Sequence, residues 1–150
     1  MPVERYWEDF TVGQKFVSGS VTVTAEQITA FASEFDPQPF HTSATAAAGS
    51  FFGGLVASGW HTAALTMRLL VLSELQVVGG LIGAGLDEVK WSRPVRPGDT
   101  LHVVPEVLEV RPLKSRPRQG IVRVKVETFN QDNQVVQTLV ANLFVPRRPV

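Results

Sequence analysis

Residues 58–75 form the segment that most constrains the fold, because apolar side chains recur in it at helical spacing on almost every side. A helix that is apolar all round is stable only where protein surrounds it. We therefore expect a long buried helix with other secondary structure packed around it. Its apolar residues are Trp60, Ala63, Ala64, Leu65, Met67, Leu69, Leu70, Val71, Leu72 and Leu75.

The second half of the chain changes to the two-residue period of β-strands. Residues 121–129 alternate valine with charged side chains, the polar residues 130–133 form a turn, and residues 135–145 return as a second strand. This pattern predicts an antiparallel hairpin with one face in water.

Three further strands are expected earlier in the chain. Residues 16–23 are rich in valine, threonine and serine, and residues 86–93 and 100–110 lie on either side of a Pro-Gly-Asp turn. Pro105 should kink the last of these strands or place it at a sheet edge. Antiparallel strands that follow a buried helix predict an α+β fold, in which one curved sheet wraps around the long helix.

A shorter helix is expected to begin after Thr24, because Gln27 three residues later completes a capping box. Pro37 disfavours helical backbone at Asp36, so this helix should end there. Its expected buried face consists of Ile28, Phe31, Ala32 and Phe35.

The residues after this helix should form an irregular loop, because the run PQPFH is rich in proline. A short alanine-rich turn is expected next, starting at Thr42 or Ser43 and ending at Gly49.

Composition excludes several classes of function. A chain of 150 residues suits one domain, 1–150, and its 14 basic and 14 acidic side chains cancel, so it offers no charge for binding nucleic acid. With no cysteine, it has neither a thiol nucleophile nor a thiolate metal site. The first ten residues do not resemble a secretory signal, and the uncharged residues 75–86 are too few to span a bilayer. We expect a cytoplasmic protein without membrane contact.

Asp36 and His41 are the candidates for acid–base chemistry. His41 follows Asp36 by five positions, across a loop stiffened by Pro37 and Pro39, so a carboxylate and an imidazole can be held against one water molecule. Burial at a helix carboxyl end should raise the pKa of Asp36 toward that of a usable acid. The spacing fits equally well with two purely structural caps, Asp36 for the loop and His41 for the turn after it.

The run FASEFDPQPFH resembles the hydratase motif of MaoC-like and R-specific enoyl-CoA hydratases, with Asp36, Pro39 and His41 at the matching positions. Residues 91–101, WSRPVRPGDTL, and 6–16, YWEDFTVGQKF, resemble two further segments of that family. The resemblance implies a hotdog fold, with Asp36 and His41 as the catalytic pair. It also implies a homodimer or higher oligomer with its sites near the subunit boundary, no metal, and no cofactor beyond the coenzyme A of the substrate.

The chain departs from the family pattern near the expected site. Phe35 stands where the family usually has glycine, Gln38 where it has asparagine, and Ser58-Gly59 where it has a histidine-glycine pair. The resemblance makes the Gly59 N–H the expected third catalytic group, a donor to the thioester carbonyl. Apart from the resemblance, a glycine at this position could equally allow tight packing at the helix start. Ser58 could contact substrate or simply cap the helix. The expected substrate-binding residues are Phe35, Gln38, Phe40, Ser58, Trp60 and Arg93.

The remaining polar features favour structural roles. His61 suits a hydrogen-bonded core histidine better than a base, and His102 suits a structural or solvent-facing position. The basic residues 111–118 could reach the phosphates of coenzyme A, although a solvated loop is the favoured interpretation. The glycines at 79–85 lack a dinucleotide fingerprint and should let chain pass close to chain.

The resemblance to MaoC-like hydratases implies the addition of water to a trans-2-enoyl thioester to give an R-3-hydroxyacyl thioester, or the reverse reaction. The acyl carrier could be coenzyme A or acyl carrier protein. Two alternatives stay open: a thioesterase, in which an acidic residue directs water at the carbonyl carbon, and a non-catalytic partner subunit that binds an acyl thioester.

Overall fold

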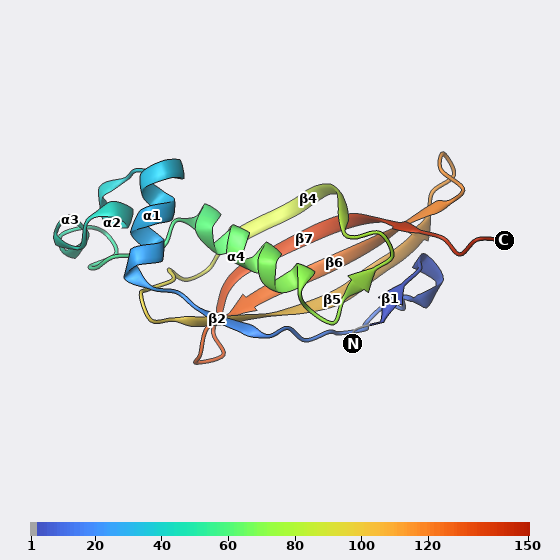
Figure 1. The fold of residues 1–150 in the computed structure, drawn as a ribbon, viewed down its shortest axis with the longest axis horizontal. Coiled ribbons are helices and arrows are strands. Elements are labelled where there is room, and N and C mark those ends of the chain that lie inside the picture. The colour runs from blue at the N-terminus through green and yellow to red at the C-terminus, as the bar shows by residue number, and fades with distance from the viewer. Residues whose placement is uncertain (1–2) are drawn as a thin grey trace.

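A five-stranded antiparallel sheet dominates the molecule, with strands in the order β2-β5-β6-β7-β4 (Figure 1). This computed structural model describes residues 3–150, so the first two residues of the predicted domain lie outside it. The strands are β2 (Ser20–Thr22), β4 (Ile82–Trp91), β5 (Thr100–Pro112), β6 (Gln119–Phe129) and β7 (Val135–Pro146). The sheet curves around helix α4 (Gly59–Val71), and the predicted α+β hotdog architecture is confirmed.

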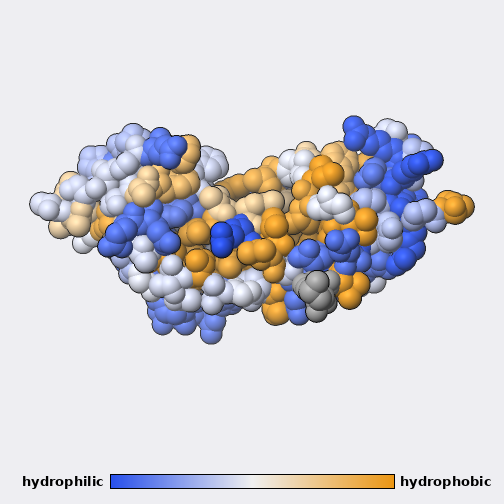
Figure 2. All heavy atoms as spheres, viewed as in Figure 1, coloured by the Kyte–Doolittle hydropathy of each residue, from blue (hydrophilic) through white to orange (hydrophobic). Residues whose placement is uncertain are grey.

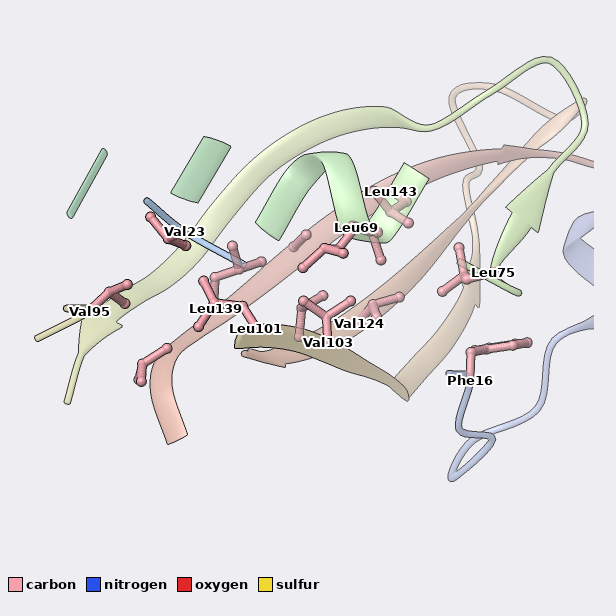
Figure 3. Close-up of a cluster of buried hydrophobic side chains, with 14 of the residues drawn as sticks. Phe16, Val23, Leu69, Leu75, Val95, Leu101, Val103, Val124, Leu139 and Leu143 are labelled. Atoms are coloured by element: carbon pink, nitrogen blue, oxygen red, sulfur yellow. The ribbon is translucent and has the colours of Figure 1, made fainter. Parts of the chain in front are cut away.

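The hydrophobic core lies between α4 and the inner face of the sheet. Figure 3 shows Leu69 of α4 beside Leu143 of β7, with Val103 and Val124 on the neighbouring strands. Alternation puts every second side chain of β5, β6 and β7 into this layer, as the two-residue period predicted.

One face of α4 is nevertheless exposed, so residues 3–150 by themselves do not surround the helix as expected. Its exposed large apolar residues are Trp60, Met67 and Val71, followed by Leu72 just after the helix. The helix also ends before residue 75. Its C-cap is Leu72, whose N–H donates to the carbonyls of Arg68 and Leu70. Figure 2 shows apolar atoms gathered in the middle of the face on which α4 lies.

The strand predicted at 16–23 is shorter than expected. Only Ser20–Thr22 pairs with β5, and an isolated bridge joins Lys15 to Glu106. Between them the backbone finds other partners: the Val17 N–H donates to the Glu74 carboxylate at 2.9 Å, and the Ser18 hydroxyl accepts from a β5 amide. Ahead of this arm lie β1 (Glu4–Arg5), paired in parallel with β3 (Gln76–Val77), and the 3-10 helix η1 (Trp7–Asp9).

Helix α1 (Ala25–Phe35) begins with the predicted capping box and ends at Asp36 as predicted. Ile28 and Ala32 are buried and Phe31 is half-buried, but Phe35 is 64% exposed, so its predicted burial is wrong.

The proline-rich loop contains a short helix, α2 (Pro39–Thr42), where irregular structure was predicted. Proline at the first helical position needs no N–H partner and has a suitable φ, so Pro39 starts a helix here. Ser43 then caps α3 (Ala44–Ala48), which ends at Gly49 as predicted.

The hairpin of β6 and β7 is confirmed, and its turn contains Asn133 at φ 57°. Pro105 lies inside β5 and does not end the strand. It lies beyond the part of β5 that pairs with β2, and its carbonyl faces the amino-terminal arm, where it accepts the Phe16 N–H at 3.0 Å. The expectation that the glycines before and within β4 let another chain segment pass close by is wrong, because nothing lies where their side chains would stand. A Cβ at Gly79, Gly80 or Gly85 would meet nothing within 4 Å, and positive φ angles explain these three residues instead.

Candidate active site

Asp36 and His41 face each other where α1 gives way to α2. Asp36 is the residue after the last turn of α1, and His41 lies on α2, which Pro39 starts. The Asp36 Oδ2 lies 3.3 Å from the His41 Nε2. The proline-braced loop therefore brings the two predicted groups together.

Two donors hold the Asp36 carboxylate. The Ser58 hydroxyl donates to Oδ2 at 2.7 Å and the Gln38 amide to Oδ1 at 2.6 Å. Burial raises the pKa of Asp36, but these hydrogen bonds and the charge of His41 together outweigh burial and place the pKa below its ordinary value. The expectation of a raised pKa for Asp36 is wrong, because it did not include the hydrogen bonds that Gln38 and Ser58 donate to the carboxylate.

His41 is buried and fixed through its second ring nitrogen. The Nδ1 lies 2.7 Å from the carbonyl oxygen of Val56, which can only accept, so Nδ1 carries a proton. The opposite nitrogen, Nε2, faces the Asp36 carboxylate. Phe40 packs edge-on against the imidazole, with ring centroids 4.5 Å apart.

A pocket of about 350 Å³ lies at the amino end of α4, and His41 lines it, whereas Asp36 lies behind His41 and is not among its lining residues. Of the predicted residues, His41, Gly59 and Arg93 line this pocket. As the first residue of α4, Gly59 has an N–H that cannot bond within the helix, and it has no acceptor among residues 3–150. The other lining residues are Phe51, Phe52, Val56, Ala57, Thr62, Trp91, Ser92, Pro94 and Val95.

The other predicted substrate-binding residues lie around the pocket. Gln38 and Ser58 hold Asp36, and Ser58 also caps α4 by accepting the Trp60 N–H. Phe40 packs between His41 and Phe52. Trp60 and Phe35 are exposed and do not line the pocket.

Trp91 is the principal residue of the pocket that sequence reasoning missed. Its indole lies against Gly59, so close that a Cβ on that glycine would come within 2.6 Å of it. The available signal was its place at the start of the run WSRPVRPGDTL, residues 91–101, which the hydratase resemblance covers.

A larger hollow of about 630 Å³ lies at the carboxyl-terminal tail. Two of its arginines are already paired, Arg147 with Glu8 and Arg148 with Asp9, and no acid–base pair of the kind formed by Asp36 and His41 lines it. We therefore assign the chemistry to the smaller pocket.

The other two histidines do not line the pocket, although His61 lies in the first turn of α4. His61 is 6% exposed and stacks on Phe31 at 4.7 Å, and burial lowers its pKa. Its Nδ1 has no hydrogen-bond partner among the described residues, so the expected hydrogen-bonded core histidine is only half right. His102 is half-buried and stacks on Phe129.

Among residues 3–150, no three histidine, aspartate or glutamate side chains cluster as a metal site would require. Within the same range, no helix has the length and apolar character needed to cross a membrane.

A curved sheet around one helix, with an acid–imidazole pair at the helix amino end, is the arrangement of hotdog-fold hydratases. Comparison with known families agrees, since the family described as the MaoC like domain matches residues 9–130. The chain belongs to the MaoC-like domain family.

Individual relatives support this assignment. The structure is similar to that of a MaoC-like dehydratase from Rhodospirillum rubrum, with a TM-score of 0.93, 53% identity, and coverage of 97% of this chain and 99% of the other. For the R-hydratase PhaJ1 from Pseudomonas aeruginosa the TM-score is 0.76 at 28% identity, covering 95% and 86%. The uncharacterized protein YdeM of Bacillus subtilis is 34% identical over 83% of this chain and 86% of its own length.

Proposed function

We propose that this protein adds water to trans-2-enoyl thioesters to give R-3-hydroxyacyl thioesters, or catalyses the reverse dehydration. The observation that carries the proposal is the contact between the Asp36 Oδ2 and the His41 Nε2, 3.3 Å apart, beside a pocket that the Gly59 N–H also lines. The similarity to R-hydratases with 28% and 26% identity supports the same reaction.

In the proposed hydration, Asp36 acts as the base. Its lowered pKa keeps it ionised at neutral pH, so it accepts a proton from the water whose oxygen adds to C3 of the substrate. In this proposal His41 starts with a proton on each ring nitrogen, donates the Nε2 proton to C2, and then regains a proton from Asp36 across their contact. The substrate gains one water, and both side chains return to their starting states.

Gly59 is the proposed donor to the thioester carbonyl. As C3 is attacked, negative charge moves onto the carbonyl oxygen, and an N–H at a helix amino end stabilises that charge. Coenzyme A enters the proposal only as part of the substrate, and we propose that Arg93, which lines the pocket, contacts its polar portion.

The test is hydration of crotonyl-CoA, followed by loss of absorbance at the enoyl-thioester band. Asp36→Asn and His41→Ala should each lower kcat by about 100-fold or more, the scale expected for loss of general acid–base catalysis. His102→Ala, an imidazole lost far from the pocket, should match the parent. Parent-level rates in both site variants would overturn the assignment.

The same assay separates the alternatives. Release of free thiol without loss of the enoyl band would indicate a thioesterase. An inactive parent that still binds a saturated acyl-CoA would indicate a binding subunit.

We further propose that the protein is a homodimer with its sites near the subunit boundary. The exposed apolar face of α4 starts at Trp60, whose ring packs edge-on against Trp91 of the pocket at 5.4 Å, so a partner covering this face would lie next to the site. Met67→Glu should convert the dimer to a monomer in analytical ultracentrifugation. Glu34→Lys, at an exposed position on α1, should leave the dimer intact. A monomeric parent would overturn this proposal.

A further inference from the structure

The amino end of α4 is held from two sides. On one side, the Ser58 hydroxyl donates to Asp36, which joins the helix start to the catalytic loop. On the other side, the Trp91 indole lies against Gly59, where a Cβ would be 2.6 Å from Cε2 and 2.8 Å from Cδ2. The position of the Gly59 N–H therefore depends on where the indole lies.

A buried chain of hydrogen bonds fixes the indole. The Trp91 Nε1–H donates to the Gln137 Oε1 at 2.8 Å, and the Gln137 amide donates to the Thr66 hydroxyl at 3.0 Å. Thr66 lies 2.6 Å from the Thr128 hydroxyl. Gln137, Thr66 and Thr128 are all fully buried.

This chain connects the sheet to the helix at a second point. Gln137 lies on β7 and Thr128 on β6, whereas Thr66 lies on α4 two turns after Gly59. A buried amide would be costly if left unpaired, and both ends of the Gln137 side chain are used. Gln137 thus sets the indole and the helix relative to the same strand.

We infer that Trp91 is a positioning residue for the Gly59 N–H, and that Gln137 fixes its orientation. The inference rests on the proposed function, because positioning matters for catalysis only if that N–H meets the substrate carbonyl. Neither Trp91 nor Gln137 needs to touch the reacting atoms.

The test compares Gln137→Met and Trp91→Phe with Ser73→Ala. Methionine removes both hydrogen bonds of Gln137 at similar volume, and phenylalanine keeps an aromatic ring at residue 91 but removes its N–H. Ser73, also buried, bonds the Leu70 carbonyl and the Leu75 N–H at the opposite end of α4, so its loss controls for general destabilisation.

Two measurements are made on each protein. The first is the amide resonance of Gly59 in a ¹H–¹⁵N spectrum of the free protein, which a displaced indole shifts through its ring current. The second is steady-state hydration of crotonyl-CoA. We expect both site variants to move the Gly59 resonance and to lower kcat about tenfold with little change in KM, less than the ~100-fold for losing a donor outright. Ser73→Ala should do neither.

The outcomes distinguish the two proposals. If the variants move the Gly59 resonance but the parent hydrates no enoyl thioester, the result supports the positioning and rejects the proposed function. If Gln137→Met and Trp91→Phe leave the Gly59 resonance where it is in the parent, the positioning inference is wrong. It is also wrong if the parent is active and these variants leave its kcat unchanged. A variant that does not fold is replaced by Thr128→Val, which breaks the same chain at its far end.

Discussion

Gly59→Ala provides the sharpest test of how the site is built. In an ordinary helix, alanine is more favourable than glycine by about 1 kcal/mol, so propensity alone predicts a more stable protein. The structure predicts the opposite, because the new methyl group would lie 2.6, 2.8 and 2.9 Å from three atoms of the Trp91 ring. Carbon atoms normally pack at about 3.5–4.0 Å, so the ring or the helix start must move by about 1 Å.

The size of the effect follows from that displacement. Overpacking of this kind costs about 1–3 kcal/mol of unfolding free energy. A shift of about 1 Å in a catalytic group can lower activity by ~100-fold. We therefore expect a lower midpoint of urea unfolding together with a large loss of kcat.

The assays are urea unfolding and crotonyl-CoA hydration on the same preparations. Gly19→Ala is the matched control, since a Cβ there meets nothing within 4 Å and the backbone is not left-handed. A Gly59→Ala protein as stable and as active as the parent would refute the reasoning about both the contact and the N–H.

Three further outcomes are expected. Ser58→Ala removes a donor that lowers the pKa of Asp36, so the acid limb of the pH–kcat/KM profile should move to higher pH; an unmoved limb would show that Asp36 does not set it. Burial lowers the pKa of His61, so parent stability should fall as pH drops below about 6.5, where the unfolded histidine binds a proton and the folded one does not. His61→Phe should weaken that dependence in unfolding measured from pH 7 to 5, and an identical slope would contradict the cause. Gly120→Ala should lower the unfolding midpoint, because its Cβ would come within 2.3 Å of the Trp7 ring, and an unchanged midpoint would argue against that packing.

Features that depend on a few neighbouring residues were predictable from the sequence. The capping box of Thr24 and Gln27 and the hairpin of β6 and β7 are set by side chains close to the backbone they satisfy. Asp36 and His41 belong to the same group, because only four residues, two of them proline, lie between them and leave few ways to hold them apart.

The helix pattern of residues 58–75 was predictable, but its surroundings were not. Hydrophobic periodicity records which faces avoid water and does not say whether the cover comes from the same chain. The exposed stripe from Trp60 to Leu72 shows the difference.

By itself, then, the sequence determined the capping box of α1, the β6–β7 hairpin, the α+β class and the identity of the acid–imidazole pair. Only the tertiary structure decided the charge state that Asp36 favours, since one of its two donors, Ser58, is 22 residues away. It likewise decided that Trp91 of β4 packs on Gly59 and bonds to Gln137 of β7. The physical reason is range: short hydrogen bonds and ring contacts act over a few ångströms, and only the pairing of distant strands brings these groups within that distance.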